Sequence, residues 1–139
     1  MVKVQTKAAS STIDRIHEVR SWVESRTIER RTETLLVLLS LFGKDHGVLI
    51  GSPGTAKTQL LKDICRCIKV NLFRAQVSKD TPLKRLTGDM DIPTYVNEGR
   101  VKFNTAGYIL DANVAHLCEL FLMNTTTQSG LLNLMSDGE

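Results

Sequence analysis

The chain has 139 residues, of which 42% are hydrophobic and 24% are charged, so it is long enough for one globular domain with a buried core. Aromatic residues make up only 5%, which argues against a base-stacking platform for single-stranded nucleic acid. A net charge of +3 does not by itself indicate nucleic-acid binding. The start of the chain lacks the apolar core of a signal peptide, and no apolar run reaches transmembrane length. We therefore expect a cytoplasmic protein that does not contact a membrane.

Three cysteines, an odd number without metal-type spacing, indicate free thiols in a reducing compartment: Cys65, Cys67 and Cys118. Cys65 and Cys67 are two residues apart and point to different faces of a predicted helix. We therefore expect Cys65 to lie in the core and neither residue to bind a metal.

Helical patterns dominate the first part of the chain, after a loose tail of residues 1–9. Ser11 followed by Asp14 predicts a helix start. The face of this first helix is formed by Ile13, Ile16, Arg20 and Val23. A second helix is predicted from about Ile28 to Phe42, with Gly43 as its C-terminal cap. Its apolar stripe consists of Ile28, Leu35, Leu36, Leu39 and Phe42.

A basic cluster joins these two helices and contains Arg26, Arg30 and Arg31. A solvated face is the favoured interpretation. Contact with a nucleotide, a nucleic acid or a protein partner is the alternative.

A glycine-containing loop follows a short apolar strand predicted at residues 47–50, and a helical pattern starts at Lys57. The loop consists of Gly51, Ser52, Pro53, Gly54, Thr55, Ala56, Lys57 and Thr58. It is close to the phosphate-binding pattern G-x-x-x-x-G-K-[ST], with Ala56 in place of the second glycine. Its glycines allow a tight turn, and the start of the helix offers unpaired N–H groups to an anion. Lys57 can reach the β- and γ-phosphates, and the Thr58 hydroxyl can bind Mg²⁺. A simple strand-to-helix turn is the alternative.

The rest of the chain alternates predicted strands and helices. Strands are expected at residues 70–77 and 113–118, a short capped helix at 81–88, a β-hairpin at 94–103 and a final helix at 125–135. The last helix should pack through Leu131, Leu132 and Met135. A strand, a phosphate loop, a helix and a second strand form a βαβ unit, which predicts a parallel sheet.

Hydrolysis of a bound triphosphate also needs an acidic residue that holds Mg²⁺ and a carboxylate that polarises water. The residues alone leave two candidates, Cys118-Glu119 at the end of one apolar segment and Asp111 at the end of another.

Several of these motifs together resemble the MoxR/RavA branch of the AAA+ ATPases over roughly residues 28–137. The shared features are Glu29-Arg30 ahead of an apolar helix, the loop with alanine before Lys57, Thr81-Pro82, Leu86-Thr87-Gly88, Asn97-Glu98-Gly99-Arg100 and the segment 107–112. The resemblance places Leu117-Cys118-Glu119-Leu120-Phe121 on the family's Leu-Asp-Glu-Ile-Phe, which makes Asp111 a loop residue before the strand.

The resemblance implies roles for individual residues. Gly51, Gly54, Lys57 and Thr58 match the Walker A ligands of ATP and Mg²⁺, and Glu119 matches the carboxylate that activates water. Cys118 occupies the position of the Mg²⁺-linked Asp, where a thiol is a poor ligand for a hard cation. ATP binding is therefore implied more strongly than hydrolysis.

The implied fold is a three-layer αβα P-loop NTPase with a parallel sheet of order 5-1-4-3-2. The chain is expected to hold a tail and helix in residues 1–26, and a partial AAA+ core in 27–139 with the phosphate loop, the hairpin insertion and the Walker B-like strand. By the resemblance, the sensor-1 strand, the arginine finger and the lid are expected to have no counterpart in it, which would make it either the N-terminal part of a longer ATPase or a truncated relative. An isolated chain of this length is therefore expected to expose strand edges and to bind ATP weakly or aggregate.

Three functions remain open at this point. The first is an ATP-binding module of a hexameric, chaperone-like MoxR-type ATPase that remodels a protein partner. The second is a non-hydrolysing nucleotide-binding or assembly subunit. The third is a DNA-linked AAA+ protein, such as a helicase loader or an MCM-like protein, although no groove-reading motif supports nucleic-acid binding.

Overall fold

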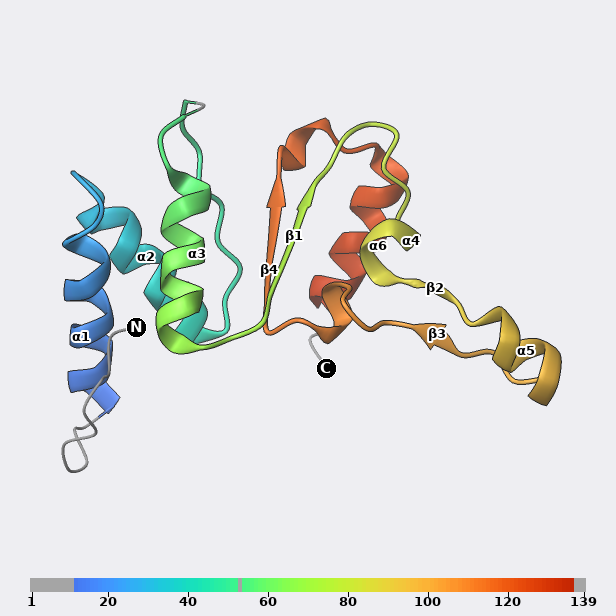
Figure 1. The fold of residues 1–139 in the computed structure, drawn as a ribbon. Coiled ribbons are helices and arrows are strands. Elements are labelled where there is room, and N and C mark those ends of the chain that lie inside the picture. The colour runs from blue at the N-terminus through green and yellow to red at the C-terminus, as the bar shows by residue number, and fades with distance from the viewer. Residues whose placement is uncertain (1–11, 53, 137–139) are drawn as a thin grey trace. The chain divides into compact units, whose positions relative to one another are not determined.

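A computed structural model describes residues 12–52 and 54–136 of the chain (Figure 1). The predicted helix start at Ser11 and the loop residue Pro53 lie outside the described residues. The chain divides into two compact units, Met1–Lys69 and Val70–Glu139, and each is described by itself. The structure is mixed α/β with a parallel pair of strands. The predicted division into residues 1–26 and 27–139 stays a prediction.

The first unit is helical where it is described. Its elements are α1 (Thr12–Glu24), α2 (Arg31–Gly43) and α3 (Lys57–Ile68). Each of these helices contacts the other two. The buried side chains at these contacts are Val23, Thr34, Val37, Leu38, Leu60, Leu61, Asp63, Ile64 and Cys65. The predicted helical pattern after the loop is confirmed, and so is the placement of Cys65 in the core.

The predicted apolar stripe of the second helix is wrong. Ile28 precedes the helix and is 89% exposed, and the other four members of the stripe are exposed as well. The helix instead packs through Thr34, Val37 and Leu38. Apolar residues surround most of this helix, so their spacing could not show which side meets α1 and α3. The predicted face of the first helix is confirmed in part, because Val23 is buried and Ile16 and Arg20 are half-buried, whereas Ile13 is exposed.

The apolar strand predicted at residues 47–50 does not form a strand in the structure. A strand requires a hydrogen-bonded neighbour, and the strands within the described residues pair only with one another. Ile50 is accordingly 84% exposed, whereas Leu49 is half-buried and lines a pocket at the loop. The segment therefore leads into the loop as irregular backbone.

The second unit is built on two parallel strands, β1 (Leu72–Gln76) and β4 (Val114–Cys118). Ala75 pairs with Leu117 in their register, and the Val77 N–H donates to the Cys118 carbonyl at 3.0 Å. The sequence prediction of these two strands, and of their parallel direction, is confirmed.

Short helices and one long helix cover one face of this strand pair. They are α4 (Lys84–Thr87), η1 (Ile109–Asp111), η2 (Leu120–Leu122) and α6 (Thr125–Ser136). Their apolar core consists of Val77, Leu86, Met123 and Leu131, with Phe73, Ala75 and Leu117 packed against it. A buried hydrogen bond from Thr127 Oγ1 to the Thr81 carbonyl, 2.9 Å long, ties α6 to the segment before α4. Leu132 is exposed, contrary to the predicted packing of the last helix.

An arm of residues 89–104 replaces the predicted β-hairpin. It consists of β2 (Asp89–Met90), α5 (Ile92–Glu98) and β3 (Phe103–Asn104), with β2 antiparallel to β3 and α5 at the tip (Figure 1). Capping explains the helix, because the Asp91 side chain accepts from the Thr94 N–H and Gly99 ends the helix in the left-handed conformation. The caps therefore outweigh the strand preference of Tyr95 and Val96.

Candidate phosphate-binding site

The loop before α3 curls through left-handed backbone. Gly54 has φ of +76° and Ala56 has φ of +57°, so the conformational demand for glycine falls on these two positions. Gly51 has no positive φ, and a Cβ there would meet Lys57 Nζ at 3.6 Å, an ordinary contact. The loop thus turns at Gly54 and Ala56, whereas Gly51 leaves room beside the lysine amine.

Replacing Ala56 with glycine is expected to stabilise the loop by about 1 kcal/mol, because a left-handed conformation strains a residue with a Cβ by that order. Urea unfolding of the variant measures the gain. The matched change Ala112→Gly, at φ of −95°, should instead destabilise the chain. A loss of stability in Ala56→Gly would show that the loop does not adopt this backbone.

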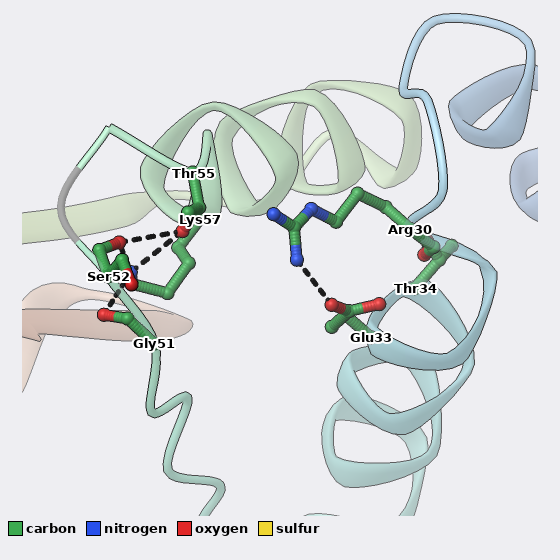
Figure 2. A network of polar contacts seen from close by, with 7 residues as sticks. All are labelled: Arg30, Glu33, Thr34, Gly51, Ser52, Thr55 and Lys57. Carbon is green, nitrogen blue, oxygen red and sulfur yellow. Dashed lines mark hydrogen bonds and ion pairs between the residues drawn. The ribbon is translucent and has the colours of Figure 1, made fainter.

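Lys57 directs its ammonium group into the curl of the loop (Figure 2). Its Nζ donates to the Gly51 carbonyl at 2.8 Å, to the Ser52 carbonyl at 2.6 Å and to Thr55 Oγ1 at 2.9 Å. Thr55 Oγ1 in turn donates to the Ser52 carbonyl at 2.9 Å. The side chain that carries the positive charge is therefore held at the loop by its own neighbours.

The start of α3 adds backbone donors at the same place. The first intrahelical bond runs from the Leu60 N–H to the Ala56 carbonyl, 2.9 Å long, so the N–H groups of Lys57, Thr58 and Gln59 have no acceptor inside the helix. These groups and the helix dipole favour an anion at the helix start. The ammonium of Lys57 and the start of α3 therefore make this end of the helix favourable for an anion.

A pocket of about 80 Å³ opens beside the loop. It is lined by Arg30, Glu33, Leu49, Ile50, Gly51, Thr55, Lys57 and Leu60, all in the first unit. Ligand pockets for whole organic molecules usually enclose roughly 300 Å³ or more. The pocket therefore suits a phosphate group and not an entire nucleotide.

Arg30 and Glu33 belong to this pocket, although the sequence favoured a solvated face for Arg30 and assigned nothing to Glu33. Arg30 Nη1 donates to Glu33 Oε1 at 2.5 Å. The backbone N–H of Glu33, followed by the Arg30 guanidinium, holds the pKa of the Glu33 carboxyl below its ordinary value. The spacing of three residues at the start of a helix is the one sequence signal that could have suggested the pair.

The candidate hydrolytic residues lie in the second unit, at the end of β4. Cys118 is half-buried, with its Sγ 3.7 Å from Nε2 and 3.8 Å from Nδ1 of His116. Glu119 follows with φ of +62° and is exposed. Asp111 lies ahead of the strand in η1, where its Oδ2 accepts from the Gly107 N–H at 3.0 Å. The position of Asp111 agrees with the predicted loop role, and the roles of Cys118 and Glu119 stay predictions.

Metal-ligand clusters and membrane-spanning helices are both absent from the described part of the chain. Over residues 12–52 and 54–136 there is no cluster of three or more His, Cys, Asp or Glu side chains placed to hold a metal ion. The same part of the chain contains no helix with the length and apolar character needed to cross a membrane.

The chain is similar to one known protein family and to several individual proteins. Residues 14–138 match the family described as the MoxR domain in the MoxR-vWA-beta-propeller ternary systems. Two uncharacterized proteins of Methanocaldococcus jannaschii, MJ0079 and MJ0812, are each 30% identical to the chain, over 92% and 88% of its length. Structural protein ORF618 of Acidianus two-tailed virus is 28% identical over 83% of the chain.

The chain spans only part of these relatives. It covers 34% of MJ0079, 33% of MJ0812 and 19% of the viral protein. No solved structure matches the chain significantly.

Proposed function

The chain belongs to the MoxR-type AAA+ ATPases, in the family of MoxR domains from MoxR-vWA-beta-propeller ternary systems, and we propose a function on this basis. We propose that the chain binds ATP through the loop Gly51–Thr58. The observation that carries the proposal is the placement of Lys57 Nζ inside a left-handed loop at the start of α3. Lys57 and the N–H groups at the helix start would hold the β- and γ-phosphates. The Thr58 hydroxyl would hold Mg²⁺, which neutralises charge on the triphosphate when it is bound.

We also propose, from the family motif, that the residue after β4 takes part in hydrolysis. Glu119 would orient and deprotonate the attacking water, which is the role that the family motif gives it. Cys118 takes the motif position of the Mg²⁺-linked Asp, where a sulfur ligand would serve Mg²⁺ poorly. Slow hydrolysis, or binding without hydrolysis, is therefore the expected behaviour of the natural sequence.

Replacing Cys118 with aspartate is expected to raise Mg²⁺-dependent ATP hydrolysis about tenfold, because an oxygen ligand replaces the thiol. Glu119→Gln should lower hydrolysis roughly 100-fold and leave ATP binding in place. Phosphate release by the purified chain measures both effects. Asp111→Ala is the control and should not change the rate. Loss of hydrolysis in Asp111→Ala, with no change in Cys118→Asp, would show that the other strand end carries the chemistry.

Protein partners are the proposed targets of the ATPase. The arm of residues 89–104 exposes a set of apolar side chains along its two short strands, its helix and the segment between them: Met90, Ile92, Tyr95, Val96, Val101 and Phe103. Exposed apolar groups of this kind favour contact with another protein over contact with nucleic acid. The family description names vWA and beta-propeller components, and we propose proteins with such domains as partners. We further propose that the protein works in the cytoplasm and assembles into a ring of six copies.

A nucleotide-binding assembly subunit without hydrolysis is the second candidate. Cys118 favours it, and one relative is named a structural protein. The phosphate-release assay separates the two functions, because this candidate predicts ATP binding without turnover in both the natural sequence and Cys118→Asp. Salt-dependent DNA binding would instead favour a DNA-linked AAA+ protein.

A further inference from the structure

Arg30 is the cation of the predicted basic cluster that lines the loop pocket. It is the N-terminal cap residue of α2, and its side chain extends from the start of that helix toward α3 (Figure 2). Only 27% of the side chain is exposed. Lys57 and Arg30 thus border one small pocket from two different elements, although they are 27 positions apart in the sequence.

The backbone of Arg30 is fixed by a buried threonine. The Arg30 carbonyl accepts from the Thr34 N–H at 2.9 Å and from Thr34 Oγ1 at 2.6 Å. Thr34 itself is fully buried. The base of the arginine side chain therefore starts from a defined position, which lowers the entropy lost when the guanidinium binds a ligand.

Glu33 fixes the other end of the same side chain. Its Oε1 accepts from Arg30 Nη1, which uses one of the five N–H donors of a guanidinium. The carboxylate also places a negative charge in a pocket beside a phosphate loop, where it would repel a phosphate chain unless a cation neutralised it. Arg30 provides that neutralisation and keeps donors for a second acceptor.

We propose that Arg30 is a second phosphate-binding cation of this site and contacts the phosphate chain of a nucleoside triphosphate. The inference rests on the proposed nucleotide-binding function and adds a residue to it. A guanidinium suits the task because its planar fork of donors matches the oxygens of a phosphate group. Lys57 and Arg30 would then contact the phosphate chain from two elements that border the same pocket, the start of α3 and the start of α2.

Competition binding against a fluorescent ATP analogue tests the inference with two probes, ATP and inorganic tripolyphosphate. Compared in the background of Glu33→Gln, which removes the repulsion of the unpaired carboxylate, Arg30→Gln should weaken the binding of both probes about tenfold or more, the loss expected for a charge-assisted hydrogen bond. Arg30→Lys should recover part of the loss, because it keeps the charge without the fork. Arg66→Gln, which removes an exposed arginine of α3 outside the pocket, is the matched control and should change neither affinity.

Two results would overturn the inference. Unchanged affinity for both probes in Arg30→Gln, with a normal thermal unfolding curve, would return Arg30 to a solvated face. Weaker ATP binding with unchanged tripolyphosphate binding would place Arg30 on the base or the ribose. Lys57→Ala separates these outcomes from a failure of the proposed function. If Lys57→Ala abolishes ATP binding and Arg30→Gln does not, only the proposed role of Arg30 is wrong. If Lys57→Ala changes nothing, or if the natural chain binds neither probe, both proposals fall.

Discussion

Replacing Lys57 with alanine is expected to weaken ATP binding about 100-fold, a loss of roughly 3 kcal/mol for charge-assisted hydrogen bonds to a phosphate chain. The ammonium already lies at the loop, held by the Gly51 and Ser52 carbonyls and by Thr55 Oγ1. The exchange of these neutral acceptors for charged phosphate oxygens is the source of the binding energy. Isothermal titration calorimetry with ATP measures the difference in affinity.

A control is needed because Lys57 also supports the shape of the loop. Lys62→Ala removes a lysine from the same helix, outside the pocket, and should leave the affinity unchanged within a factor of about two. Circular dichroism of both variants tests whether α3 remains folded. Equal affinities in Lys57→Ala and Lys62→Ala would contradict the role of the loop.

Gly88→Ala is expected to destabilise the second unit by about 3 kcal/mol, through overpacking and backbone strain together. Gly88 ends α4 at φ of +103°, and an added Cβ would come within 2.1 Å of the Asn104 carbonyl oxygen in β3. Because the nearest atom belongs to the backbone, relief would require the two strands of the arm to move apart. Thermal unfolding followed by circular dichroism measures the loss.

Gly99→Ala provides the matched comparison. Gly99 also has a left-handed backbone, with φ of +63°, but nothing lies within 4 Å of an added Cβ. The cost should therefore be the strain alone, about 1 kcal/mol. Equal losses in the two variants would show that the close approach of Gly88 to Asn104 is not part of the fold.

The sequence predicted those helices and strands whose residues show a clear hydrophobic period or clear turn residues at their ends. Helix α3 follows from apolar residues at helical spacing, and β1 and β4 follow from short apolar segments with turn residues on either side. The parallel pairing of β1 with β4 agrees with the sheet order that the family resemblance implied, whereas the βαβ unit predicted around the loop lacks its first strand at residues 47–50.

Other elements depended on information that the residue pattern does not hold. The segment 94–98 contains strand-favouring residues, but the Asp91 cap and Gly99 decide the outcome in favour of a helix. Helix α2 is apolar on most sides, so the choice of Thr34, Val37 and Leu38 for the interior depends on the shapes of α1 and α3.

The candidate site was predictable where one short segment forms it. The residue types from Gly51 to Thr58 predicted a phosphate-binding loop. The alanine before the lysine, together with the other shared motifs, indicated the MoxR branch of the family. The sequence left nucleotide contact by the basic cluster as an alternative, but it could not show that Arg30 is the member at the pocket, because that place depends on the packing of α2 beside α3 and on the position of Thr34. Distant residues enter a site through tertiary packing, which spacing along the chain does not encode.

Titration of the ¹⁵N-labelled chain with ATP and Mg²⁺, followed by amide NMR, tests the central claim most directly, and it does so even if the affinity is low. We predict that saturable shifts are largest at the amides of Gly54, Lys57, Thr58 and Gln59, and that Lys57→Ala removes them. The absence of shifts at these amides at millimolar ATP, or saturable shifts confined to the second unit, would contradict nucleotide binding by this loop.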